Sequence, residues 1–166
     1  MKIPVMGQGV TLTELPNEIA VFFEIGNCKQ HCEGCHSPEL WTDEGAKWLT
    51  VDDLKEYIKT QRGITAVVFM GGTTNYGIDP EEFLEKIVKP ISKEYPVGLY
   101  HGCIEFPYNR DVLTWLKIGR YIECQGGLAS PHTNQKMLYK LPNGEWTNIT
   151  SFFYKGDKWR KNYLTH

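Results

Sequence analysis

The sequence predicts an α/β domain whose parallel strands alternate with helices and curve into part of a barrel. Three apolar runs, at residues 19–25, 66–70 and 97–100, have the composition of strands that are buried on both faces. Helical patterns with capping residues lie between them, which indicates right-handed βαβ units. With 166 residues, of which 41% are hydrophobic, the chain can fill one core, so we expect a single domain over residues 1–166.

The elements of the first half have clear boundaries. The strand at 19–25 ends at Gly26-Asn27, and a loop with three cysteines follows directly. A helix is expected from Thr50, because its hydroxyl can cap the first turn and Asp53 can complete a capping box. The apolar stripe of this helix consists of Val51, Leu54 and Ile58.

The strand at 66–70 runs into Gly71-Gly72, and a second helix is expected from Asp79-Pro80. Pro90 is expected to kink or end that helix. The inward side of the helix is formed by Phe83, Leu84, Ile87, Val88 and Ile91.

The second half of the chain is less regular. Residues 97–100 predict a third strand, the apolar residues Val112, Leu113 and Leu116 predict a third helix, and residues 121–124 predict a fourth strand. Beyond Asn134 the pattern weakens, and only a turn at residues 142–144 is expected.

Loops that follow parallel strands form the active face of such folds. The cysteine loop and the Gly71-Gly72 step follow two such strands, so we expect them to lie side by side.

Cys28, Cys32 and Cys35 have the spacing Cys-x3-Cys-x2-Cys, and three thiols this close argue against a disulfide framework. Three thiolates on one loop can bind three irons of a [4Fe-4S] cluster, which leaves the fourth iron open for a small molecule. Gly34 helps the loop to close tightly. The spacing therefore predicts a redox or radical enzyme.

Three other metal or redox sites are compatible with parts of this pattern. A zinc site could combine the cysteines with His36, although adjacent residues seldom bind one tetrahedral ion together. Residues 32–36 match a c-type haem attachment sequence, but the third cysteine would then have no role. A thioredoxin-like Cys-x2-Cys would likewise leave Cys28 unused.

Composition excludes several classes of partner. The net charge of −2 and the absence of a basic excess argue against nucleic acid. No apolar run approaches the length of a membrane span, and residues 1–10 do not resemble a signal peptide. We therefore expect a cytoplasmic protein without a membrane partner.

Two separated stretches carry a family resemblance. The first is Cys35-His36-Ser37-Pro38-Glu39-Leu40-Trp41, which follows the first two cysteines, and the second consists of residues 119–123, 126–128, 130–131 and 133–135. The chain resembles the radical S-adenosylmethionine (SAM) enzymes that activate anaerobic ribonucleoside-triphosphate reductases. The resemblance covers about residues 17–136, and the tail at 137–166 is unassigned.

The resemblance implies a radical SAM-like fold, a [4Fe-4S] cluster and SAM as cofactors, and a glycyl radical made on the reductase. It places SAM beside Gly71 and Gly72 and its adenine near His36. This family usually continues Gly-Gly-Glu-Pro, and here Thr73 stands in place of the glutamate, so a hydrogen bond from that glutamate to SAM is lost or is replaced by one from Thr73. The implied partners are the large subunit of the reductase and an electron donor such as flavodoxin.

Alternative functions are another radical SAM activase, a small-molecule radical SAM enzyme, or a zinc-binding interaction module without catalysis. Cys103 and Cys124 are expected to be buried small apolar residues outside the cluster. Asn134 and Gln135 are expected to satisfy backbone groups rather than to bind a ligand.

Overall fold

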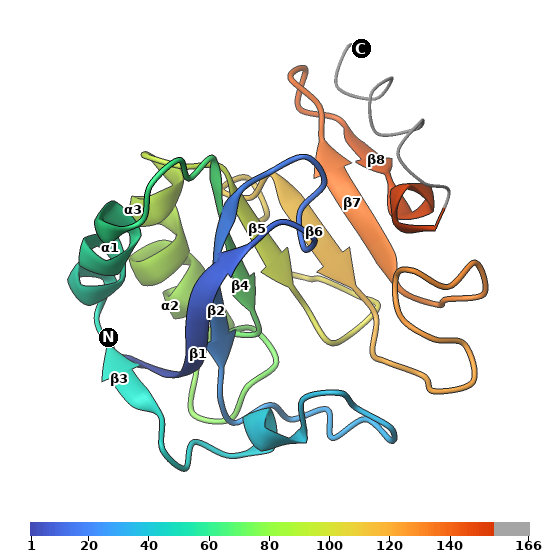
Figure 1. The fold of residues 1–166 in the computed structure, drawn as a ribbon, viewed down its shortest axis with the longest axis horizontal. Helices are drawn as coiled ribbons and strands as arrows, with labels where there is room; N and C mark the ends of the chain where they lie inside the picture. Colours follow the sequence, from blue (N-terminus) through green and yellow to red (C-terminus); the bar gives the residue numbers. More distant parts are fainter. Residues whose placement is uncertain (155–166) are drawn as a thin grey trace.

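The computed structural model describes residues 1–154 and contains one eight-stranded sheet with helices packed on one face (Figure 1). The strand order is β3-β1-β2-β4-β5-β6-β7-β8. The strands are β1 (Ile3–Thr11), β2 (Ala20–Ile25), β3 (Lys47–Leu49), β4 (Ala66–Met70), β5 (Val97–Tyr100), β6 (Trp115–Ile118), β7 (Lys136–Lys140) and β8 (Trp146–Asn148). The four central strands β2, β4, β5 and β6 are parallel, and all outer pairs are antiparallel.

The helices are short. They are α1 (Val51–Thr60), α2 (Pro80–Phe83) and α3 (Lys89–Ser92), with a π-helix η2 (Leu84–Val88) between the last two. Two 3-10 turns, η1 (Pro38–Trp41) and η3 (Thr150–Phe153), complete the set. None of the helices in the described part of the chain is long and apolar enough to cross a membrane.

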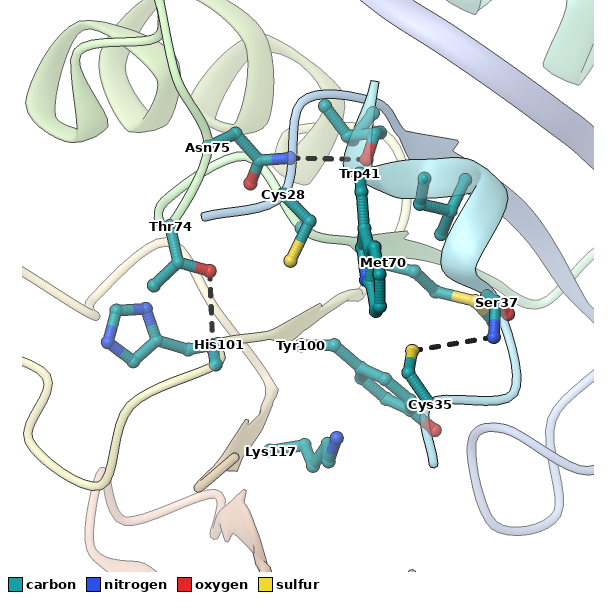
Figure 2. Close-up of a pocket in the computed structure, with 14 residues that line it drawn as sticks. Cys28, Cys35, Ser37, Trp41, Met70, Thr74, Asn75, Tyr100, His101 and Lys117 are labelled. Atoms are coloured by element: carbon teal, nitrogen blue, oxygen red, sulfur yellow. Dashed lines mark hydrogen bonds between the residues drawn. The ribbon is translucent and has the colours of Figure 1, made fainter. Parts of the chain in front are cut away.

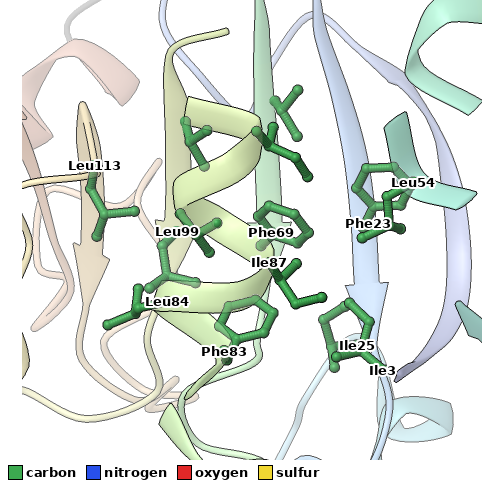
Figure 3. Packing of buried hydrophobic residues seen from close by; sticks show 14 of the residues in the cluster. Ile3, Phe23, Ile25, Leu54, Phe69, Phe83, Leu84, Ile87, Leu99 and Leu113 are labelled. Atoms are coloured by element: carbon green, nitrogen blue, oxygen red, sulfur yellow. The ribbon is translucent and has the colours of Figure 1, made fainter. Parts of the chain in front are cut away.

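Strand β4 shows why an unbroken apolar run forms a central strand. Val67 and Phe69 point toward the helices, whereas Val68 points to the opposite face, and all three are fully buried. Figure 3 shows Phe69 packed against Phe83 of α2, with their ring centroids 5.4 Å apart. Both faces of β4 are therefore covered, as its composition predicted.

The predicted helix starts are confirmed. The Thr50 hydroxyl accepts a hydrogen bond from the Asp53 N–H, and the Asp53 carboxylate accepts one from the Thr50 N–H. The Asp79 carboxylate caps α2 by accepting a hydrogen bond from the Glu82 N–H at 2.8 Å. The helical segment does not end at Pro90 but continues to Ser92. Proline has no N–H to donate to the preceding turn, and here that turn is the π-helix, whose wider winding accommodates the missing hydrogen bond.

Two of the expected elements are wrong. Leu116 lies in strand β6 rather than in a helix, and residues 121–124 form a turn rather than a strand. The spacing of residues 112, 113 and 116 suits a helix, but Leu116 pairs with Leu99 of β5. Pairing with a neighbouring strand outweighs the local pattern, so no helix joins β5 to β6.

Strands β1, β3, β7 and β8 were not anticipated. Strands β1 and β3 extend the sheet beyond β2, and β7 and β8 extend it beyond β6. The turn predicted at 142–144 joins β7 to β8, and the Gly144 N–H donates to the Leu141 carbonyl there. The parallel arrangement is confined to the central strands, and the partial barrel stays a prediction. Residues 155–166 of the predicted tail lie outside the described residues.

Candidate metal centre

The cysteine loop leaves the carboxyl end of β2 and is closed at its base by backbone hydrogen bonds. The Cys28 N–H donates to the Leu40 carbonyl at 2.8 Å, and the Asn27 N–H donates to the Thr42 carbonyl at 3.1 Å. Within the loop the His31 ring stacks on Trp41, with centroids 4.7 Å apart and planes 8° apart. These contacts fold residues 28–41 into a compact lobe over the end of the sheet.

Two of the three thiols face the same cavity. Cys28 and Cys35 line a space of about 140 Å³, together with Trp41 and Lys117 (Figure 2). The Ser37 N–H donates to Cys35 Sγ at 3.4 Å. Cys32 is buried and is not among the residues that line this cavity. Within residues 1–154, no three His, Cys, Asp or Glu side chains converge closely enough to hold a single metal ion.

The electrostatics of the loop suit a bound cation. Burial raises the pKa of the Cys28 thiol, and the nearby Cys32 and Cys35 raise it further. Backbone N–H groups of Gln30 and His31 act in the opposite direction. A positively charged metal core would relieve the mutual repulsion of three thiolates, and amide donors to sulfur are usual around iron–sulfur clusters. The donor set and its surroundings therefore fit a cluster.

The two glycines after β4 have different environments. Gly71 lines the cysteine cavity and has a φ of 102°, which favours glycine. Gly72 has a φ of 110°, and a Cβ built on it would lie 2.4 Å from the Phe83 ring. Gly71 is thus the glycine that can contact a ligand in the cavity. Gly72 lacks a side chain where the buried Phe83 ring packs against it.

Asn75, which the sequence analysis did not single out, joins the glycine turn to the cysteine loop. Its side chain is 1% exposed and accepts from the Gly72 N–H at 2.7 Å. Its amide group donates to the carbonyls of Ile25 and Gly26 at 3.1 and 2.7 Å. Backbone pairing of Cys28 with Asn75 adds a further link. The expected proximity of the two loops is confirmed.

Thr73 is buried and does not line the cavity, but it contacts His101, which does. The Thr73 hydroxyl lies 2.8 Å from His101 Nδ1, and His101 Nε2 lies 2.9 Å from the Glu105 carbonyl. A carbonyl only accepts, so Nε2 carries the proton and Nδ1 accepts from the hydroxyl. Burial lowers the pKa of His101, in keeping with this neutral form. Thr74 and His101 line the cavity in place of Thr73.

His36 lies outside the cysteine cavity. It is exposed, and its ring packs against Tyr121 with centroids 5.3 Å apart. Tyr121 also lines a second cavity of about 430 Å³ on the outer side of the loop, together with Glu33, Arg120, Ile122, Glu123 and Cys124. His36 is thus not among the residues that line the cavity with Gly71, and its place near the adenine of SAM stays a prediction.

Cys103 and Cys124 are exposed, so the expectation that they are buried is wrong. Cys103 lies in the loop after β5, and Cys124 lies in the turn that was expected to be a strand. Both of these segments are at the surface. The Gln30 side-chain amide donates to Cys103 Sγ at 3.3 Å, which places this thiol beside the cysteine loop. As expected, the side chains of Asn134 and Gln135 hydrogen-bond backbone carbonyls, those of Arg120 and Gly119.

Tyr100 and Lys117 line the cysteine cavity and form a polar group with Glu14, which lies outside it. The Tyr100 hydroxyl donates to the Glu14 carboxylate at 2.5 Å, and the Lys117 ammonium lies 4.9 Å from the centre of the Tyr100 ring. Burial lowers the pKa of Lys117 to about 8, whereas Glu14 and the three cysteines act in the opposite direction. Tyr100 and Lys117 also line a neighbouring cavity of about 360 Å³.

Comparison with protein families indicates which kind of metal centre the domain holds. The family model described as a 4Fe-4S single cluster domain matches residues 5–107, which is more than half of the chain. The chain belongs to this 4Fe-4S single cluster family. The matched range of the 4Fe-4S domain contains the cysteine loop, the glycine turn and strand β5. No curated protein shows significant similarity to it.

The match supports the predicted cluster over the zinc, haem and thioredoxin-like alternatives. The assignment of Cys28, Cys32 and Cys35 as its three ligands stays a prediction. They form the one Cys-x3-Cys-x2-Cys pattern in the sequence, and the matched range contains only one other cysteine, Cys103.

Proposed function

We propose that the chain is a radical SAM activating enzyme that generates a glycyl radical on an anaerobic ribonucleoside-triphosphate reductase. The observation that supports this proposal best is the shared cavity of Cys28, Cys35 and Gly71 in a 4Fe-4S domain. When bound, the cluster supplies one electron for cleavage of the SAM sulfonium, which gives methionine and a 5'-deoxyadenosyl radical that removes a hydrogen atom from a glycine of the reductase.

The residues of the chain bind and orient SAM in this proposal. At Gly71 the main chain can approach the methionine part of SAM because no side chain intervenes. Asn75 fixes this turn against the start of the cysteine loop. The cavity of about 140 Å³ is smaller than the roughly 300–1,000 Å³ of small-molecule sites. We therefore expect SAM to extend into the neighbouring cavity that shares Tyr100 and Lys117.

The exposed apolar side chains around the cavity are consistent with a protein as the substrate. Tyr76 and Ile104 are 57% and 52% exposed, and each lies within two residues of a residue that lines the cavity. Large exposed apolar side chains near a site favour contact with another protein. A partner that covers this rim would also exclude water from the reacting groups.

The decisive experiment mixes reduced protein, SAM and the reductase without oxygen. The reductase carries deuterium on its glycine α-carbons, and reduced flavodoxin or dithionite supplies electrons. We expect a doublet organic-radical EPR signal on the reductase and deuterium in the 5'-deoxyadenosine. SAM cleavage without deuterium transfer would contradict the activase assignment and favour a small-molecule substrate. Absence of any SAM cleavage by the loaded protein would contradict the radical SAM assignment itself.

A further inference from the structure

We propose that the Lys117 ammonium is the counter-charge of the metal centre and raises its reduction potential, although Lys117 binds no iron. This inference rests on the cluster part of the proposed function and not on SAM or the reductase. It assigns a role to a residue of strand β6 that lines the same cavity as Cys28 and Cys35 (Figure 2).

The first argument is the composition of the cavity wall. Of the described residues that line the cysteine cavity, Lys117 is the only Lys or Arg, and none is Asp or Glu. Burial lowers the pKa of His101 and so favours its neutral form, against the opposing effect of the hydrogen bond to the Glu105 carbonyl. The charge closest to the thiols within this wall is therefore a single ammonium group.

The second argument is the way in which Lys117 is held. Its side chain is partly buried, and its ammonium lies over the Tyr100 ring at 4.9 Å. The Tyr100 hydroxyl is in turn fixed by the Glu14 carboxylate at 2.5 Å. A cation that is held by an aromatic face and is partly removed from water interacts strongly with nearby charge.

The third argument concerns the charge of the cluster. Three thiolates contribute three negative charges, and each added electron makes the site more negative. In the reduction step a low-potential one-electron reductant, such as dithionite or reduced flavodoxin, transfers one electron to the cluster. No covalent bond forms or breaks and no proton moves, so Lys117 remains an ammonium throughout. The ammonium stabilises the reduced form more than the oxidised form.

The test is a redox titration of the reconstituted full chain at pH 7, followed by EPR, without SAM. We expect Lys117→Met to lower the ratio of reduced to oxidised cluster at a fixed potential by about tenfold. This equals a shift of about 59 mV to more negative potential for one electron. Charge interactions of this size are ordinary in partly buried sites with an effective dielectric constant of about 20.

Two variants serve as controls. Lys117→Arg keeps the charge and should stay close to the wild-type potential. Lys59→Met removes an exposed lysine of α1 and should change nothing. The proposal is overturned if Lys117→Met carries a full cluster with the wild-type potential, or if Lys117→Arg shifts the potential as far as Lys117→Met.

Glu14→Gln keeps the test decisive if Lys117→Met does not assemble a cluster. This variant removes a negative charge near Lys117 and retains an acceptor for the Tyr100 hydroxyl. Because Glu14 raises the pKa of Lys117, this variant is titrated at pH 6, where Lys117 stays an ammonium without that carboxylate. We expect its potential to rise, and an unchanged potential with a full cluster would refute the counter-charge role. Because SAM is absent, the result is independent of whether SAM is the ligand, which the deuterium experiment decides separately.

Discussion

Single residues around the sulfur atoms determine how the cysteine loop can hold metal. Backbone N–H groups surround two of the thiols, with Ser37 donating to Cys35 and with Gln30 and His31 acting on Cys28. Such donors stabilise a sulfur that carries negative charge, and they do so only if the loop keeps its shape. Each thiol is therefore tied to the conformation of the backbone beside it.

Replacement of each loop cysteine tests the ligand assignment. Cys28→Ala, Cys32→Ala and Cys35→Ala should each abolish the full cluster, because two thiolates on the loop cannot hold three irons. The measurement is iron and sulfide per chain after anaerobic reconstitution, where about four of each are expected for the unmodified protein. Cys103→Ala and Cys124→Ala are matched controls and should retain the cluster. Loss of iron in either control would show that the cysteines are divided wrongly.

The two glycines after β4 should respond differently to alanine. Gly71→Ala introduces backbone strain at positive φ, with an expected loss of about 1–3 kcal/mol in the free energy of unfolding. Gly72→Ala adds a clash with the buried Phe83 ring, and its total loss should be roughly 2–5 kcal/mol.

Urea denaturation of the metal-free proteins provides the measurement. Among variants that still bind metal, Gly71→Ala should weaken SAM binding more than Gly72→Ala does, because only Gly71 lines the cavity. Equal effects on SAM affinity would contradict the different roles of the two glycines.

At the scale of elements, the site depends on the register between the loops that follow β2 and β4. The Lys29 N–H donates to the Thr74 carbonyl at 2.9 Å, and the Tyr76 N–H donates to the Asn27 carbonyl at 2.8 Å. Asn75 lies between these two bonds and adds its side chain. The glycine turn and the cysteine loop thus behave as one unit.

Asn75→Ala should uncouple this unit. Loss of its buried hydrogen bonds should cost roughly 2–4 kcal/mol and leave the Gly26 carbonyl and the Gly72 N–H without partners. Iron should be lost to a chelator several-fold faster than from the wild type. Thr50→Ala, which removes the cap of α1 at a cost of about 1 kcal/mol, should lose iron at the wild-type rate. Similar rates in both variants would show that Asn75 affects only global stability.

The sequence predicts the elements that have a strong local signal. Strands β2, β4 and β5 and the starts of α1 and α2 follow from apolar runs and capping residues. Strand β6 was missed because the spacing of its residues also suits a helix and only pairing with β5 decides between them. Strand β1 contains Pro4, Gly7 and Gly9, which weaken a strand pattern that pairing with β2 and β3 restores.

The part of the candidate site that was predictable consists of residues whose chemical role requires a fixed spacing along the sequence. Cys28, Cys32 and Cys35 are recognisable because cluster ligands need thiols on a short loop. Asn75 and Lys117 were missed because a single amide or ammonium has no distinctive spacing. Their roles arise from the sheet, which brings the end of β4 and the middle of β6 to the same cavity.

For the whole molecule, the asymmetry of the sheet is the main feature. Helices α1, α2 and α3 pack on one face (Figure 1). The other face is covered by loop and terminal segments, which contribute the buried side chains of Leu15, Ile149 and Phe152. The cysteine loop and the glycine turn lie at the carboxyl ends of β2 and β4, where they can be exposed to a partner while the core stays covered.

The burial of the first four residues of strand β4, between β2 and β5, has a consequence for the time scale of metal exchange. Its amide hydrogens should exchange with deuterium only through global unfolding, whereas those of the cysteine loop should exchange through local opening. Anaerobic chelation should therefore accelerate exchange in residues 28–41 and leave β4 protected, as measured by mass spectrometry of peptic fragments. Equal acceleration in both segments would mean that metal loss unfolds the domain. The expected pattern would let the protein lose and regain its cluster while the scaffold remains folded.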